Sequence, residues 1–225
     1  MKRTILAGLL ALCMYACALP ARGFAEGIPE GGQAINGSEG EATHAPAAPK
    51  WAGDTVAVIQ YPDGSYEEYE TLKRAVDSAS QSEPVTIQIV ADTVETKTIY
   101  AAGSRNITLT ADASRTIQFS GENMGTGISV CADAAGKHGT LTITDNITIT
   151  GGEKAPTRML IDCQSGSELV LDGGTLAVES AMENSVVYVT GGSFTMKRGT
   201  IRGGNRARGI FARNWSDDSS TAVHM

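Results

Sequence analysis

The stretch that decides the fold is SELVLDGGTLAVE, Ser167–Glu179, which returns 25 residues later as GSFTMKRGTIRGG, Gly192–Gly204. TLTITDNITITGG, Thr140–Gly152, is a third copy, predicted to have one residue fewer between its two strands. Apolar residues of the first two copies align at the same spacing. The aligned pairs are Leu169 with Phe194, Leu171 with Met196, and Leu176 with Ile201. Self-similarity at this period predicts a solenoid of stacked repeats.

Apolar and polar residues alternate along each copy, as expected of strands that bury one face. A further short strand precedes each copy, at Ile128–Val130, Met159–Cys163 and Val186–Thr190. A unit of three short strands fits a coil in which each strand stacks on its counterpart at about 4.8 Å. The alignment predicts two inward columns of side chains: Ile143, Leu171 and Met196 in one, and Ile147, Leu176 and Ile201 in the next.

Residues 54–84 are expected to form a strand and one helix ahead of the coils, which occupy residues 85–225. Val56–Gln60 has the alternation of a strand, and Pro62-Asp63-Gly64 is typical of a turn. Between Glu67 and Ser80, apolar residues recur at three- and four-residue spacing, which predicts an amphipathic helix. The predicted fold class is therefore all-β with a single helix.

Three segments carry a resemblance to a known family: SYEEYETLKRAVDSA, VTIQIVADT and VYVTGGSFTMKRGTIRGG. They resemble bacterial right-handed parallel β-helix repeat proteins of the surface or secreted type, which are pectate-lyase-like in fold. The resemblance extends over Tyr66–Gly209. It implies a right-handed parallel β-helix solenoid in which the helix caps the N-terminal end of the coil and covers its exposed strand groups.

The N-terminus has the features of a secretory signal peptide. Lys2 and Arg3 precede the apolar run Ile5–Ala18, which is too short to span a membrane. Cleavage is expected after Ala25, so that residues 1–25 are removed, with the triplet at residues 16–18 as the alternative site. Lipid attachment at Cys17 is a second, less favoured interpretation. Residues 26–53 are rich in Gly, Ala, Pro and Glu and predict a flexible linker, which leaves a secreted or cell-surface domain.

The family's enzymes suggest where catalytic residues would lie. The Asn-x-Asp, Gly-His-Gly and Arg-x-Lys motifs of its hydrolases are absent from the chain. Asp162 and Asp172 are the weak catalytic candidates, because two carboxyl groups that face one groove could act as acid and base. We therefore expect a non-catalytic module that displays loops for adhesion or glycan binding. A polysaccharide lyase or glycoside hydrolase, and a structural fragment of a larger adhesin, are the alternatives.

The charge pattern suggests partners. The formal net charge of −7 argues against nucleic acid, yet six basic residues and no acidic ones occur between residues 197 and 213. Such a basic stripe predicts binding of anionic glycans or cell-wall polymers, whereas a solvated face that prevents aggregation is the alternative. An uncapped C-terminal coil end would also allow self-association. The six basic residues are Lys197, Arg198, Arg202, Arg206, Arg208 and Arg213.

The positions of the cysteines and histidines indicate which metal, cofactor and disulfide sites the chain can form. His44, His138 and His224 lie apart from other ligating residues, so no metal ion or cofactor is expected. Cys131 and Cys163 belong to matching strands, and a disulfide is geometrically possible at the coil spacing. Register opposes it, because Cys131 points outward if Val130 points inward, whereas Cys163 points inward.

Overall fold

The computed structural model describes residues 4–5, 51–152, 158–178, 185–214 and 220–225. The predicted linker up to Lys50 lies outside the described residues, as does the predicted signal peptide apart from β1 (Thr4–Ile5), which pairs antiparallel with β3. The described residues are mostly strand, in a twelve-stranded and a five-stranded sheet, with one helix. The all-β prediction is confirmed.

An antiparallel hairpin begins the twelve-stranded sheet. Its strands are β2 (Ala57–Gln60) and β3 (Tyr66–Tyr69), and β2 also pairs antiparallel with β4 (Val85–Ile89). Helix α1 (Leu72–Ser78) follows β3, and the Thr71 hydroxyl caps it by accepting a 3.2 Å bond from the Arg74 amide. The predicted helix start at Glu67 is therefore wrong, because residues 67–69 pair their backbone with β2 instead.

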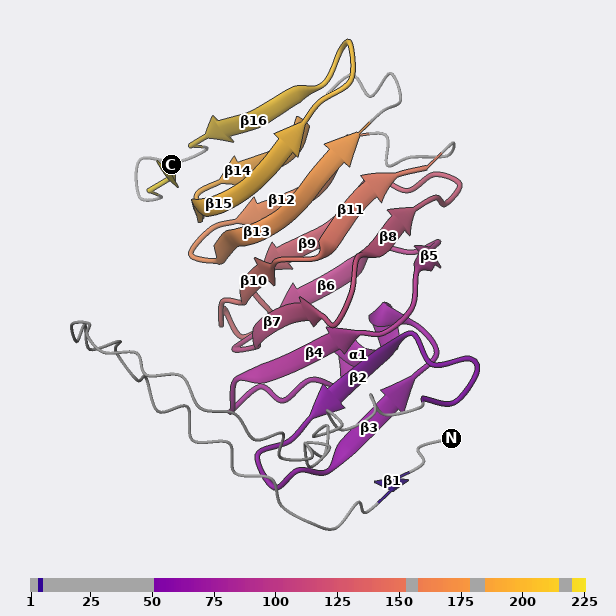
Figure 1. Ribbon diagram of the computed structural model, residues 1–225. Helices are drawn as coiled ribbons and strands as arrows, with labels where there is room; N and C mark the ends of the chain where they lie inside the picture. The colour runs from indigo at the N-terminus through magenta and orange to yellow at the C-terminus, as the bar shows by residue number, and fades with distance from the viewer. Residues whose placement is uncertain (1–3, 6–50, 153–157, 179–184, 215–219) are drawn as a thin grey trace, which may run out of the picture. The chain divides into compact units, whose positions relative to one another are not determined.

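From β4 onward, the strands form three series in which all pairings are parallel. Each pairing joins strands from successive repeats. Figure 1 shows these strands side by side. The first series consists of β4, β7 (Asn106–Ala111), β10 (Thr140–Thr144), β13 (Glu168–Val178), β15 (Ser193–Arg202) and β17 (Ala222–His224).

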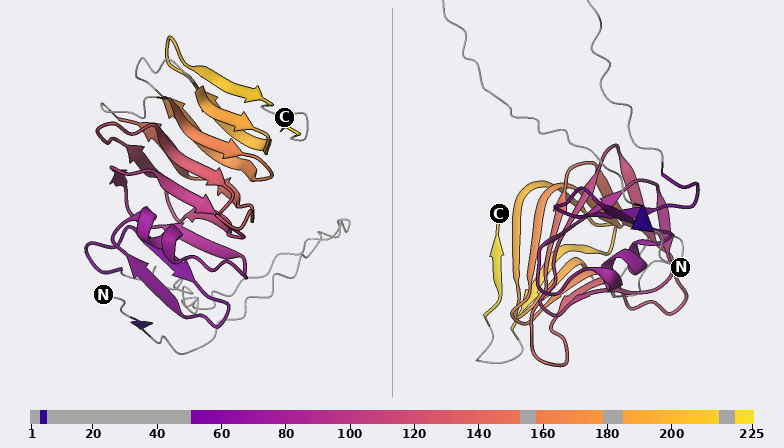
Figure 2. Two further views of the ribbon diagram at one scale, coloured as in Figure 1. Left: turned by 180° about the vertical axis from the view of Figure 1, so that it is seen from behind. Right: turned by 90° about the horizontal axis from the view of Figure 1, so that it is seen from below.

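Two more parallel series complete the sheets. The second consists of β5 (Thr93–Glu95), β8 (Arg115–Phe119), β11 (Ile147–Gly151) and the second half of β13. The third forms the five-stranded sheet from β6 (Ile99–Ala102), β9 (Thr126–Cys131), β12 (Met159–Gln164), β14 (Ser185–Thr190) and β16 (Arg208–Arg213). Figure 2 shows the same strands from behind and from below.

The core consists of the inward aliphatic columns that the repeat predicts, with one correction. Ile143 lies in register with Leu171, and Leu171 with Met196, as expected. Leu176 and Ile201 are also in register, but their partner in the third copy is Ile149 and not Ile147. The alignment pairs Leu176 with Ile147, but the residue two positions later takes that place. The turn at Asp145-Asn146, where Asn146 has φ 67°, sets this offset.

Candidate functional site

A concave polar surface on the five-stranded sheet lies over β12 and β14. Their inward residues, Ile161, Cys163, Val187 and Val189, are fully buried, and the alternate residues between them face outward. The strands are in register, so the outward residues of β12 lie beside those of β14. They form part of a groove of about 410 Å³, which is lined by Arg158, Met159, Asp162, Gln164, Ser165, Tyr188 and Thr190.

Asp162 supplies the carboxyl group of this groove. One oxygen, Oδ2, accepts a 2.7 Å bond from the Gln164 amide, whose nitrogen also lies 3.2 Å from the Ser129 hydroxyl. The other oxygen, Oδ1, is buried and has no hydrogen-bond partner among the described residues. Burial raises the pKa of Asp162 above its ordinary value, opposed by the Gln164 bond. A carboxylate in this position is stabilised by any additional donor or by a proton.

An aromatic surface continues the groove toward β16. Tyr188 and Phe211 are in register, and their rings stack with centroids 5.3 Å apart and an interplanar angle of 15°. The Arg208 guanidinium lies 4.8 Å from the centre of the Phe211 ring. Aromatic faces combined with a few fixed polar groups are the usual composition of small-molecule and sugar sites.

The two predicted catalytic carboxyl groups are not brought together. Asp162 lies on β12 in the five-stranded sheet, whereas Asp172 lies on β13 in the twelve-stranded sheet and is not among the residues that line the groove. The hypothesis of an acid and base pair fails because the corner between the two strands sends them to different sheets. Asp172 instead belongs to an ion-pair cluster.

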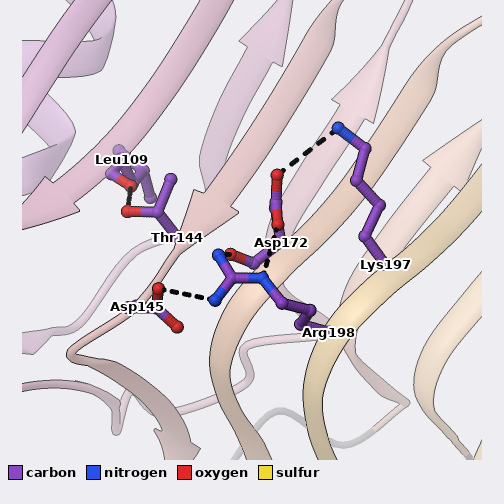
Figure 3. Close-up of polar contacts among 6 residues, drawn as sticks. All are labelled: Leu109, Thr144, Asp145, Asp172, Lys197 and Arg198. Atoms are coloured by element: carbon purple, nitrogen blue, oxygen red, sulfur yellow. Dashed lines mark hydrogen bonds and ion pairs between the residues drawn. The ribbon is translucent and has the colours of Figure 1, made fainter. Parts of the chain in front are cut away.

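That cluster joins three successive repeats of the twelve-stranded sheet (Figure 3). Asp172 lies 3.4 Å from the Lys197 ammonium and 3.1 Å from Nε of Arg198, and Arg198 also lies 3.0 Å from Asp145. The hydrogen bond from Arg198 holds the pKa of Asp172 below its ordinary value. These groups satisfy one another, so the cluster links successive repeats at the surface.

The six residues of the predicted basic stripe are all exposed, but they belong to two sheets. Lys197, Arg198 and Arg202 lie on β15, Arg208 and Arg213 lie on β16, and Arg206 lies in the connecting loop. The basic charge is therefore concentrated on β15, on β16 and in the loop between them. Lys197 and Arg198 are partly neutralised by Asp172 and Asp145.

Cys131 and Cys163 are free thiols in the structure. Cys163 is in register with Val130, and Cys131 with Ala102, so the two cysteines are offset by one residue along neighbouring strands. The Cys163 thiol lies 3.3 Å from the Ser193 carbonyl oxygen, and burial raises its pKa to about 12. The sequence predicted that strand register opposes a disulfide between the two cysteines, and the observed register places them one residue apart.

Sequence reasoning found Asp162 but missed Gln164, Tyr188 and Phe211. The available signal was their alignment as outward residues of matching strands, once Ile161 is paired with Val187. Within the described ranges, no group of three or more His, Cys, Asp or Glu side chains is placed to hold a metal ion, and no helix is long and apolar enough to cross a membrane. Comparison of the chain with protein-family models, with curated proteins and with solved structures found no match in any of the three.

Proposed function

We propose that this chain is an exported, non-catalytic glycan-binding module built as a right-handed parallel β-helix solenoid. The parallel series support the architecture, because the third series pairs strands that are three positions apart in the chain, β6 with β9 and β9 with β12, and then strands two positions apart, β12 with β14 and β14 with β16. In a solenoid of this kind, inward columns provide stability and the outward residues are free to bind ligands.

Helix α1 suits the role of an N-terminal cap. Its buried residues Leu72, Ala75 and Val76 pack into the main apolar core, and it contacts β6, the first strand of the five-stranded sheet. A helix in this position covers apolar and backbone groups that the first coil would otherwise expose.

The groove over β12 and β14 carries the functional proposal. It brings a guanidinium (Arg158), a carboxyl (Asp162), an amide (Gln164) and a phenol ring (Tyr188) to one concave surface. Sugars present hydroxyl groups that both donate and accept, and ring faces that lie against aromatic side chains. The positive charge of Arg158, with Arg208 beside Phe211, favours glycans that carry carboxylate or sulfate groups.

Binding without catalysis is favoured over a polysaccharide lyase or hydrolase. Glycoside hydrolysis ordinarily needs two carboxyl groups that flank the scissile bond, and among the described residues Asp162 is the one carboxyl group that lines the groove. Incubation with uronate polymers tests this alternative. We expect neither absorbance from unsaturated products nor new reducing ends, and the appearance of either would identify an enzyme.

A glycan array that includes uronate-containing, sulfated and teichoic-acid probes tests the binding proposal. The best glycan is then titrated against variants by calorimetry. Asp162→Asn and Tyr188→Ala are each expected to weaken binding by about tenfold or more. Asp172→Asn, the same chemical change on the other sheet, is the matched control and should bind normally. Equal binding by all variants would place the ligand elsewhere.

A further inference from the structure

The N-terminal edge of the twelve-stranded sheet is acidic. Strand β3 is the outer strand of the hairpin, and β1, a strand of two residues within the predicted signal peptide, covers only Tyr66 and Glu67. Cleavage after Ala25 would remove β1, and the described residues then provide no strand that pairs with β3 on that side. Residues 51–72 contain five acidic residues and no basic ones: Asp54, Asp63, Glu67, Glu68 and Glu70. Glu70 is paired with Arg74 at 2.9 Å, and the other four have no ion pair among the described residues.

The C-terminal edge of the same sheet is basic. Strand β17 pairs with β15 only at residues 193–195, and past Thr195 the described residues place no further strand on that side of β15. This edge carries Arg202 together with Lys197 and Arg198, which are partly neutralised by Asp172 and Asp145. Residues 197–213 hold six basic residues and no acidic ones. The two ends of one sheet thus have opposite charge.

Both ends also leave apolar side chains incompletely covered. Val56 and Tyr61 near β2 are only partly buried against the core, as are Met196 and Ile201 on β15. Deeper in the sheet, the equivalent column residues Leu171 and Leu176 are fully buried. Another layer of protein at either end would complete the burial of these groups.

Strand direction permits the two ends to join. Strand β3 is antiparallel to β2, and β2 is antiparallel to β4, so β3 runs parallel to β4 and therefore to β15. A second copy moved along the sheet by translation alone would place its β3 beside β15 of the first copy in the parallel sense of the rest of the sheet. Contacts of this head-to-tail kind do not close on themselves and generate filaments.

We propose that the processed chain assembles head to tail, with the acidic β3 edge of one copy added to the basic β15 edge of a second copy. Backbone hydrogen bonds continue the sheet, and the opposite charges select the partner and its orientation. The two edges of one kind repel each other, so β3 does not pair with β3, nor β15 with β15. This inference rests on removal of residues 1–25 and is independent of the glycan groove.

The test uses the protein purified after export, with its N-terminus established by intact mass. Light scattering is measured over a range of micromolar concentrations, at low ionic strength and in about 1 M salt, where the Debye length is about 3 Å. We expect mass to increase with concentration at low salt and to fall in high salt. A mass that stays monomeric at low salt, or a chain that retains residues 1–25, overturns the proposal.

Two charge-reversal variants identify the surfaces. Glu67→Lys/Glu70→Lys reduces the formal charge of residues 51–72 from −5 to −1, and Arg202→Glu/Arg206→Glu reduces that of residues 197–213 from +6 to +2. Each alone is expected to remain monomeric, and an equimolar mixture should form paired species because each supplies the edge that the other lacks. Lys137→Glu reverses a charge at an exposed position outside β3 and β15 and should assemble like the unmodified chain. Circular dichroism verifies folding of every variant, and folded variants that assemble alone, or that fail to pair when mixed, overturn the assignment.

Discussion

The amide of Leu72 donates a 2.8 Å hydrogen bond to Oε1 of Glu95, which joins the first turn of α1 to strand β5. Glu95 is only 4% exposed, although it carries an ionisable group. Helix α1 is seven residues long and is too short to persist in water by itself. This contact, with the burial of Leu72, therefore holds the helix against the end of the sheets.

Glu95→Ala is expected to lower the free energy of unfolding by about 1–3 kcal/mol, because the Leu72 amide loses its buried acceptor. Urea unfolding at neutral pH measures the loss. Glu95→Gln is the matched control, since its amide oxygen can still accept the bond. An Ala variant as stable as the Gln variant would show that the hydrogen bond does not hold the helix.

The pH dependence of stability provides a second prediction for the same residue. Burial raises the pKa of Glu95 above its ordinary value of 4.5, opposed by the bond from Leu72. A pKa raised by folding means that the native state binds the proton more tightly, so this contribution is complete below pH 4.5 and is lost as pH rises through the raised pKa. The stability difference between the unmodified chain and Glu95→Gln should therefore shift in favour of the unmodified chain on acidification. A difference that is constant with pH would contradict the shift.

Neighbouring residues on β13 should respond very differently to substitution. Leu171 is fully buried between Ile143 and Met196, so Leu171→Asp places an unpaired charge in the core and should cost about 3–5 kcal/mol. Asp172 faces outward, and Asp172→Ala removes only exposed ion pairs with Lys197 and Arg198. Urea midpoints compare the two, and equal losses would contradict the assigned faces.

The sequence was sufficient to predict most strands of the repeats and one inward column, because side chains alternate with a period of two in any strand. Ile143, Leu171 and Met196 follow from that period alone. The second column was wrong at Ile147, because the corner at Asp145-Asn146 sets the offset and periodicity carries no information about corners. The two shortest strands of the first repeat, β5 and β6, were not predicted because three or four residues hold too little alternation.

The helix start and the groove were missed for a different reason, since both depend on contacts between distant segments. Tyr66 and Tyr69 have the three-residue spacing of a helix, but backbone pairing with β2 makes this segment a strand. Tyr188 became part of the site because register places it beside Asp162, which lies 26 positions earlier in the chain. The pattern of residues within one strand does not show which residue of a distant strand lies beside it.

The corner glycine of β13 provides a test of close stacking between repeats. Gly174 has φ +71°, and a Cβ there would lie 2.6 Å from the Ile147 carbonyl oxygen. Gly136 has the similar φ of +75° but open space around its Cα. Gly136→Ala should cost about 1–2 kcal/mol from backbone strain alone, and Gly174→Ala should cost clearly more. Thermal unfolding measures the loss of stability in each variant. Equal losses would show that the neighbouring repeat moves away from the added Cβ without a free-energy penalty.

Thiol reactivity tests the state of the two cysteines. Cys131 and Cys163 are buried and free, and burial raises the pKa of Cys163 to about 12, so little thiolate exists near neutral pH. Iodoacetamide should leave Cys163 unmodified in the native protein and should label both thiols in urea without prior reduction. Intact mass measures each product. Labelling in urea that requires a reductant would reveal a disulfide, and the one-residue offset between β9 and β12 would then have to change, because Cys163 now faces Val130.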